Sequence, residues 1–251
     1  MAAPARPARP RTPVSIAILA VNVAVFVAQL ALPGPSGEVD EVALRLALWA
    51  PSLWDGEVWR LLTAAFIHFG PLHIFFNMFV LWDIGRLCEV VVRPARYALL
   101  YAASAVGGTV ASTLFTRGLS GGASGALFGV AGALLALVLL DRERRVFVQR
   151  DRLKGLLLRF LVINMALQFA IPHIDIAAHV GGCVTGAAVG AYLFGRSPLS
   201  GDRGAPIRRA SLAALILILL VAAYSLHPVG HPRFEAWRIS PARLIDILLG
   251  N

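Results

Sequence analysis

The stretch GGASGALFGVAGALLALVLL, residues 121–140, carries no charged side chain and one polar side chain, that of Ser124. About 20 apolar residues cross the hydrocarbon core of a bilayer as a helix. The stretch therefore predicts a membrane helix over Ser124–Leu140, opened by a Gly-rich turn. A hydroxyl at the start of such a helix needs an explanation, because polar groups inside a membrane are costly.

The composition of the whole chain has the same character. Of its 251 residues, 58% are apolar and 15% are charged, against about 45–50% and about 25% in soluble domains. These values exclude an ordinary water-soluble globule, and they also exclude disordered and fibrous classes. A polytopic membrane protein is expected.

Six further apolar runs predict helices. They cover Val14–Leu32, Leu72–Val92, Arg96–Phe115, Gly155–Ile171, Ile176–Phe194 and Ala210–Leu226. The first run is interpreted as a retained helix and not as a signal peptide. A long loop, Pro33–Phe69, follows it, and Pro241–Leu249 is compatible with a small amphipathic helix. The expected fold is an all-α bundle: a tail over 1–13, a six-helix core over 14–195, a linker and seventh helix over 196–226, and a tail over 227–251.

The basic residues predict the orientation of this bundle. With the N-terminus inside, sixteen Lys and Arg residues fall in cytoplasmic segments and six in outer segments, so the positive-inside rule favours a cytoplasmic N-terminus. The basic residues that give the net charge of +9 are therefore expected to orient the protein in the membrane, and no nucleic-acid partner is expected. The two cysteines, Cys88 and Cys183, suggest neither a disulfide framework nor a zinc site, and no metal or cofactor is expected.

Polar residues occur within three predicted helices that all run from outside to inside. They are His73 with Asn77, Ser124, and His179. Sixteen or seventeen residues separate Asn77, Ser124 and His179 from the charged residue that ends each helix on the inner side. At about 1.5 Å per residue, all three lie about 25 Å from the cytoplasmic face. They therefore share one depth, just below the outer surface.

Each cluster has both a catalytic and a structural interpretation. Ser124, between Gly122 and Gly125, is placed where helix N–H groups stabilise an oxyanion; alternatively it is an N-cap. His179 precedes a stripe of Gly182, Gly186 and Gly190 that lets two membrane helices touch. This contact would bring His179 to Ser124; alternatively the histidine bonds a neighbouring carbonyl.

His73 and Asn77 share one helix face because they are four residues apart. Both can donate hydrogen bonds, and with the N–H of Ser124 they could hold a developing oxyanion. The alternative is a purely structural contact between helices.

Taken together, these motifs resemble those of the rhomboid family of intramembrane serine proteases. The resemblance is carried by Trp59-Arg60, Phe66-Ile67-His68, His73-x-x-x-Asn77, Gly122-Ala123-Ser124-Gly125 and Ala178-His179-x-x-Gly182-x-x-x-Gly186. It covers about residues 14–195, and order, spacing and membrane placement agree jointly. The seventh helix resembles the family's six-plus-one arrangement.

The resemblance implies a Ser–His dyad without a third member. Ser124 would be the nucleophile and His179 the general base, while His73, Asn77 and the Ser124 N–H would form the oxyanion hole. Phe128 matches an aromatic that packs on the catalytic histidine, with a helix-core role as the alternative. Asp175, four residues before His179, fits a helix cap better than a third catalytic member.

The implied reaction is hydrolysis of a peptide bond in or near a transmembrane segment of a membrane-protein substrate, without a cofactor. The alternative is a catalytically inactive rhomboid-like protein that binds transmembrane segments; such relatives lack the Ser or the His, and this chain has both. A membrane metalloprotease is disfavoured because no His is followed by Glu. The Arg- and Ala-rich composition favours an integral multi-pass protein of a bacterial plasma membrane.

Overall fold

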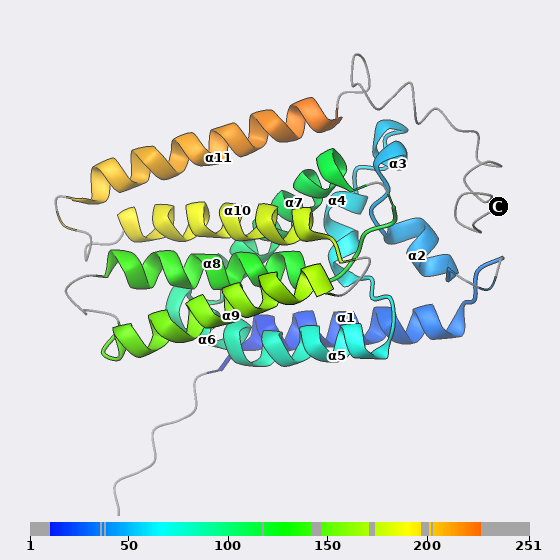
Figure 1. Cartoon of the computed structure of the whole chain (residues 1–251), viewed down its shortest axis with the longest axis horizontal. Helices are drawn as coiled ribbons and strands as arrows, with labels where there is room; N and C mark the ends of the chain where they lie inside the picture. Colours follow the sequence, from blue (N-terminus) through cyan, green and yellow to red (C-terminus); the bar gives the residue numbers. More distant parts are fainter. Residues whose placement is uncertain are drawn as a thin grey trace, which may run out of the picture.

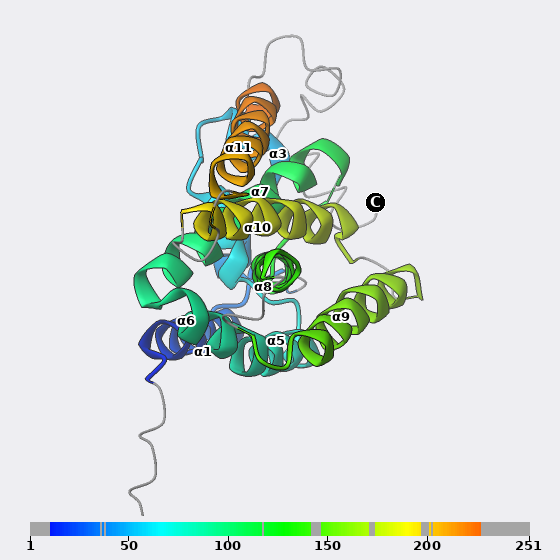
Figure 2. The same ribbon diagram turned by 90° about the vertical axis from the view of Figure 1, so that its left-hand side faces the viewer.

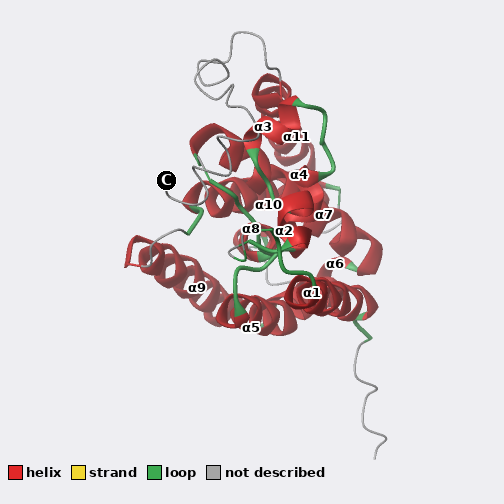
Figure 3. Ribbon diagram, turned by 90° about the vertical axis from the view of Figure 1, so that its right-hand side faces the viewer, coloured by secondary structure: helices red, strands yellow, loops and turns green. Residues whose placement is uncertain are grey.

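A computed structural model describes residues 11–35, 37, 39–116, 118–141, 147–170, 174–196, 201 and 203–226. Within these residues the secondary structure is helical, apart from an isolated antiparallel bridge between Leu48 and Ser120. Figure 3 shows the helices in red and the loops that join them in green. The predicted Pro241–Leu249 helix lies outside the described residues.

The helices follow the predicted apolar runs closely. They are α1 (Pro13–Ala31), α2 (Glu41–Leu46), α3 (Ala50–Trp54), α4 (Arg60–Thr63), η1 (Ala64–Phe66), α5 (Pro71–Val80), η2 (Leu81–Gly85), α6 (Arg86–Val92), α7 (Pro94–Phe115), α8 (Ser124–Leu140), α9 (Arg150–Ala170), α10 (Ile176–Gly195) and α11 (Gly204–Leu226). The bounds of α8 are those predicted. The helices α9 and α11 begin five and six residues earlier than expected.

Several of these helices can span a membrane. Among the described residues, α1, α7, α10 and α11 are long and apolar enough to do so. A fifth span results if Arg60–Phe66 and Pro71–Val92, which meet at a bend of 97°, count as one. The chain is thus a multi-pass, all-helical membrane protein, and the expected six-plus-one count remains a prediction.

The segment predicted as a long loop, Pro33–Phe69, contains three short α-helices and η1. The guanidinium of Arg60 organises it: although only 5% exposed, this side chain donates to the carbonyls of Ala47 and Leu44 and to the carboxylate of Glu57. Such short helices depend on tertiary contacts and leave no long apolar run in the sequence.

Hydrogen bonds from this segment also fix the Gly-rich turn before α8. Leu48 and Ser120 exchange two backbone hydrogen bonds, and the N–H of Gly122 donates to the carbonyl of Ala64 at 2.9 Å. The residues just before Ser124 are therefore fixed by a segment more than 50 residues earlier in the chain.

The helix predicted over Leu72–Val92 is interrupted in the middle. Between α5 and α6, residues Leu81–Gly85 form a π-helical turn. Such a turn inserts extra backbone into a helix, so the residues of α6 face different neighbours from those that an unbroken helix would give them.

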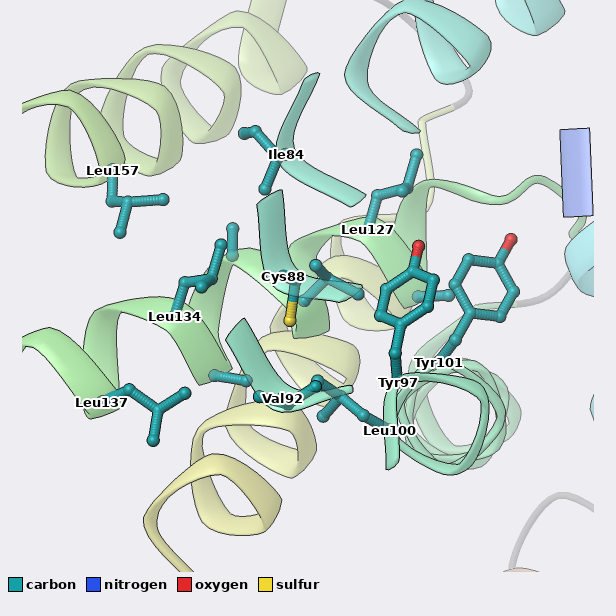
Figure 4. Packing of buried hydrophobic residues seen from close by; sticks show 14 of the residues in the cluster. Ile84, Cys88, Val92, Tyr97, Leu100, Tyr101, Leu127, Leu134, Leu137 and Leu157 are labelled. Atoms are coloured by element: carbon teal, nitrogen blue, oxygen red, sulfur yellow. The ribbon is translucent and has the colours of Figure 1, made fainter. Parts of the chain in front are cut away.

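The helix α8 lies in the middle of the bundle. Figures 1 and 2 show α7 and α10 on one side of it, and α1, α5 and α9 on the other. Figure 4 shows Leu127 and Leu134 of α8 packed with Cys88 of α6 and Leu100 of α7. Cys88 and Cys183 are free thiols.

The closest contact of α8 is with α10, and glycines make it possible. A Cβ on Gly182 would lie 2.0 Å from the carbonyl oxygen of Gly125, and one on Gly186 would lie 2.0 Å from that of Gly129. Any side chain at these positions would force the helices apart, so the glycines set the distance between α8 and α10.

The pattern of α1 is the reverse of that of a soluble helix. Its buried residues are polar, namely Ser15, Asn22 and Gln29, while Val27 and Leu30 are exposed. The carboxylate of Glu89, in the middle of α6, accepts from the N–H and hydroxyl of Ser15. This arrangement fits a helix whose outer face meets lipid.

Candidate active site

The structure brings Ser124 and His179 together. Ser124 begins α8 and His179 lies in the first turn of α10, and the Ser124 hydroxyl lies 2.6 Å from Nε2 of His179. The two residues are 55 positions apart in the sequence. They meet because Gly125 and Gly182, next to them on their helices, allow the two backbones into contact.

The ring of His179 is held by stacking and not by an acid. It lies parallel to the ring of Phe128, at a centroid distance of 4.4 Å and an angle of 7°. The side chain is buried, and its Nδ1 has no hydrogen-bond partner among the described residues. Nε2 accepts the Ser124 hydroxyl in the tautomer that carries the proton on Nδ1, which is the form that a general base requires.

Asp175 is placed beside this pair without bonding to it. Its carboxylate accepts from the N–H of Ala178 at 3.0 Å, which is the predicted helix cap. It also accepts three hydroxyl hydrogen bonds, from Ser112, from Thr116 at 2.8 Å and from Ser120 at 2.5 Å. It thereby joins the start of α10 to the end of α7 and to the turn before Ser124.

The three hydroxyl partners of Asp175 are absent from the sequence-based set of site residues. Ser112 and Thr116 are four apart, and so share one face at the end of α7. This spacing is the only local signal in the sequence, and it does not reveal that the acceptor lies about 60 residues away.

His73 on α5 approaches the Gly-rich turn. Its Nδ1 accepts the N–H of Phe69 at 3.3 Å, so Nε2 carries the proton in the neutral ring. A Cβ on Gly122 would lie 2.7 Å from this Nε2 and 3.6 Å from Oγ of Ser124. The imidazole N–H and the serine hydroxyl therefore border the same point, which is open because residue 122 is a glycine with a φ of +135°.

Asn77 lies one turn further along α5, on the same face as His73. It is buried, and its amide donates to the carbonyl of His73 at 2.9 Å. Its side chain is therefore bonded to its own helix, one turn from His73.

His68 supports His73 from the side. The two rings meet edge to face at a centroid distance of 5.0 Å. His68 is only 2% exposed, and burial lowers its pKa to about 3. The ring is thus neutral at ordinary pH, so it adds no charge beside the site.

This arrangement has the elements of nucleophilic catalysis. A hydroxyl bonded to a neutral imidazole is an activated nucleophile. Ser124 is also the first residue of a 17-residue helix, whose first N–H groups have no partner within the helix and point toward incoming negative charge. The imidazole N–H of His73 adds a further donor from the opposite side.

Comparisons with known proteins all identify the same family. Residues 55–196 match the family model of the Rhomboid domain. Similar curated proteins include "Rhomboid protease GluP" of Bacillus subtilis, which is 34% identical over 180 residues (70% of this chain and 34% of that protein). "RHOMBOID-like protein 1" of Arabidopsis thaliana is 39% identical over 135 residues (53% and 34%). "RHOMBOID-like protein 6, mitochondrial" of the same plant is 36% identical over 171 residues (67% and 53%).

The chain spans between about a third and about half of the length of these relatives. The matched residues include every candidate site residue described above, from His73 to Gly186.

Proposed function

The chain belongs to the rhomboid family, and we propose that it is an intramembrane serine endopeptidase that cleaves peptide bonds in or near the transmembrane segments of membrane proteins. The observation that carries this proposal is the contact of 2.6 Å between Oγ of Ser124 and Nε2 of His179. Both residues lie at the N-terminal ends of closely packed helices, and a similar protein is named a protease.

The reaction proceeds in two halves. Oγ of Ser124 attacks the scissile carbonyl carbon while Nε2 of His179 takes the hydroxyl proton. His179 then gives this proton to the amide nitrogen as the C–N bond breaks, which leaves an ester on Ser124. In the second half, His179 takes a proton from a water molecule that attacks the ester, and returns it to Oγ as the ester bond breaks.

The negative charge on the carbonyl oxygen is held by N–H donors. We assign this role to the backbone N–H of Ser124, the Nε2–H of His73 and the amide of Asn77. Since the Asn77 amide bonds the carbonyl of His73, its side chain must rotate or share this donor in the transition state.

The catalytic unit is a dyad. The parallel stacking on Phe128 fixes the ring plane of His179, which is the orienting function that an acid serves in a triad. Asp175 acts on the backbone at the start of α10 and has no bond to the ring.

The proposed setting is a six-helix core over residues 14–195 with α11 as an added seventh span, in a bacterial plasma membrane with a cytoplasmic N-terminus. Arg and Lys are concentrated at the beginnings of α9 and α11, at the end of the bundle away from Ser124 (Figure 1). By the positive-inside rule this end is cytoplasmic, and the site opens toward the outer face.

The test is cleavage of a single-span membrane substrate by the purified chain in detergent. Ser124→Ala and His179→Ala are each expected to abolish cleavage, and a fluorophosphonate is expected to label Ser124 in the wild-type chain. Cleavage by Ser124→Ala at the wild-type rate would disprove the dyad. A wild-type chain that neither cleaves nor is labelled would instead be an inactive, segment-binding member of the family.

A further inference from the structure

A second site lies between α10 and α11, at the end of the bundle opposite Ser124. It is a cavity of about 330 Å³, lined by Tyr192 and Arg196 at the end of α10 and by Arg208, Arg209 and Leu212 near the start of α11. Figure 1 shows the two helices running side by side, with this end remote from the start of α8. None of the candidate active-site residues lines this cavity.

The cavity carries three positive charges without an acidic partner in the described part of the chain. Neither α10 nor α11 contains Asp or Glu, and no ion pair between described residues involves Arg196, Arg208 or Arg209. Like charges this close repel one another. A bound anion would relieve that repulsion.

One of the three guanidinium groups is already oriented. Arg196 donates to the hydroxyl of Tyr192 at 3.2 Å, and its guanidinium lies over the Tyr192 ring, 5.8 Å from the centroid. Its planar fork is therefore held on the α10 side of the cavity, whose α11 side is lined by Arg208 and Arg209; all three arginines are exposed. A fork of this kind matches the oxygens of a phosphate group.

The cavity continues into an apolar track. Leu212 and Ile216 follow Arg208 at four-residue spacing, and Leu220 continues the series, so each side chain lies next to the following one in a row that winds slowly around α11. The three apolar side chains are 48%, 49% and 62% exposed. From Leu212 to Leu220 the track is about 12 Å long. It can therefore accommodate part of an acyl chain lying beside the helix, whereas a free phosphate ion would make no contact with it.

We propose that this cavity binds the phosphate of an anionic phospholipid, with the headgroup among Arg196, Arg208 and Arg209 and an acyl chain along Leu212, Ile216 and Leu220. The positive-inside orientation places the site in the cytoplasmic leaflet, where anionic lipids attract basic residues near a membrane surface.

The experiment measures lipid binding to the purified full chain in a neutral detergent. Phosphatidylglycerol and phosphatidylcholine are titrated separately, and bound lipid is counted by native mass spectrometry. The wild-type chain is expected to prefer phosphatidylglycerol. The double variant R208Q/R209Q is expected to bind it about 30-fold more weakly, and R209Q alone about five-fold more weakly.

The matched control is R152Q/K154Q, which removes two positive charges from the start of α9, away from the cavity. It is expected to bind phosphatidylglycerol like the wild type. Equal loss in both double variants would overturn the proposal by indicating general surface charge. No preference over phosphatidylcholine would overturn it by showing that the site does not select an anionic lipid. Displacement of the lipid by inorganic phosphate at equal concentration would overturn the lipid assignment in favour of a free anion.

Discussion

The contact between Gly182 and Gly125 makes a quantitative prediction for the substitution Gly182→Ala. The added Cβ would lie 2.0 Å from the carbonyl oxygen of Gly125, whereas real contacts of this kind are not shorter than 3.0 Å. Because the obstacle is backbone and not a flexible side chain, α10 must move away from α8 by about 1 Å.

A displacement of this size acts directly on the catalytic pair. His179 precedes Gly182 by three residues and Ser124 precedes Gly125 by one, so both move with their backbones. A shift of about 1 Å along the line from Oγ to Nε2 lengthens the distance of 2.6 Å to about 3.6 Å, which is no longer a hydrogen bond. A misplacement of about 1 Å costs on the order of 10²-fold in rate.

The assay measures kcat for cleavage of a single-span substrate, together with the rate at which a fluorophosphonate labels Ser124. Both are expected to fall about 100-fold in Gly182→Ala. The control is Gly155→Ala on α9, where the new Cβ meets only the end of the Arg159 side chain at 3.5 Å. A wild-type kcat and labelling rate in Gly182→Ala would refute the argument that this glycine sets the distance within the dyad.

Three further substitutions test separate parts of the structure. Asn77→Ala should lower kcat by about 10²–10³, and an unchanged kcat would remove its amide from the oxyanion hole. Asp175→Asn should lower the free energy of unfolding by about 1–3 kcal/mol, seen as a lower unfolding temperature in detergent, while cleavage continues. A loss of cleavage as deep as that in His179→Ala would instead indicate that Asp175 is a third catalytic member. Glu89→Gln weakens the hydrogen bonds to Ser15 by a similar amount, so its unfolding temperature should fall while kcat stays unchanged; an equal fall in kcat would contradict a purely structural role.

The sequence predicts well what depends on the length of a bilayer. The bounds of α8 follow from an apolar run that begins at Ser124 and ends before Asp141. The common membrane depth of Ser124 and His179, obtained by counting residues along straight helices, stays a prediction. Both inferences are local, since each needs only one helix and the thickness of a membrane.

Features that depend on distant partners are not predictable in this way. The helices α2 to α4 form around contacts such as those of Arg60, and Asp175 collects hydroxyls that lie 55 to 63 residues away in the sequence. The π-helical turn over Leu81–Gly85 likewise has no local signal. In each case a contact in three dimensions selects among local conformations that the sequence leaves close in energy.

The polar seam of α1 has a consequence for where the functional unit begins. Gln29 and the backbone of His68 exchange two hydrogen bonds, from Nε2 to the carbonyl and from the N–H to Oε1. The ring of His68 in turn rests against His73. A fragment trimmed to residues 55–196 would thus retain Ser124 and His179 but lose the amide of Gln29, which anchors the wall of the candidate site formed by His68 and His73. The smallest unit that keeps the whole proposed site therefore starts at α1, outside the segment by which the family is identified.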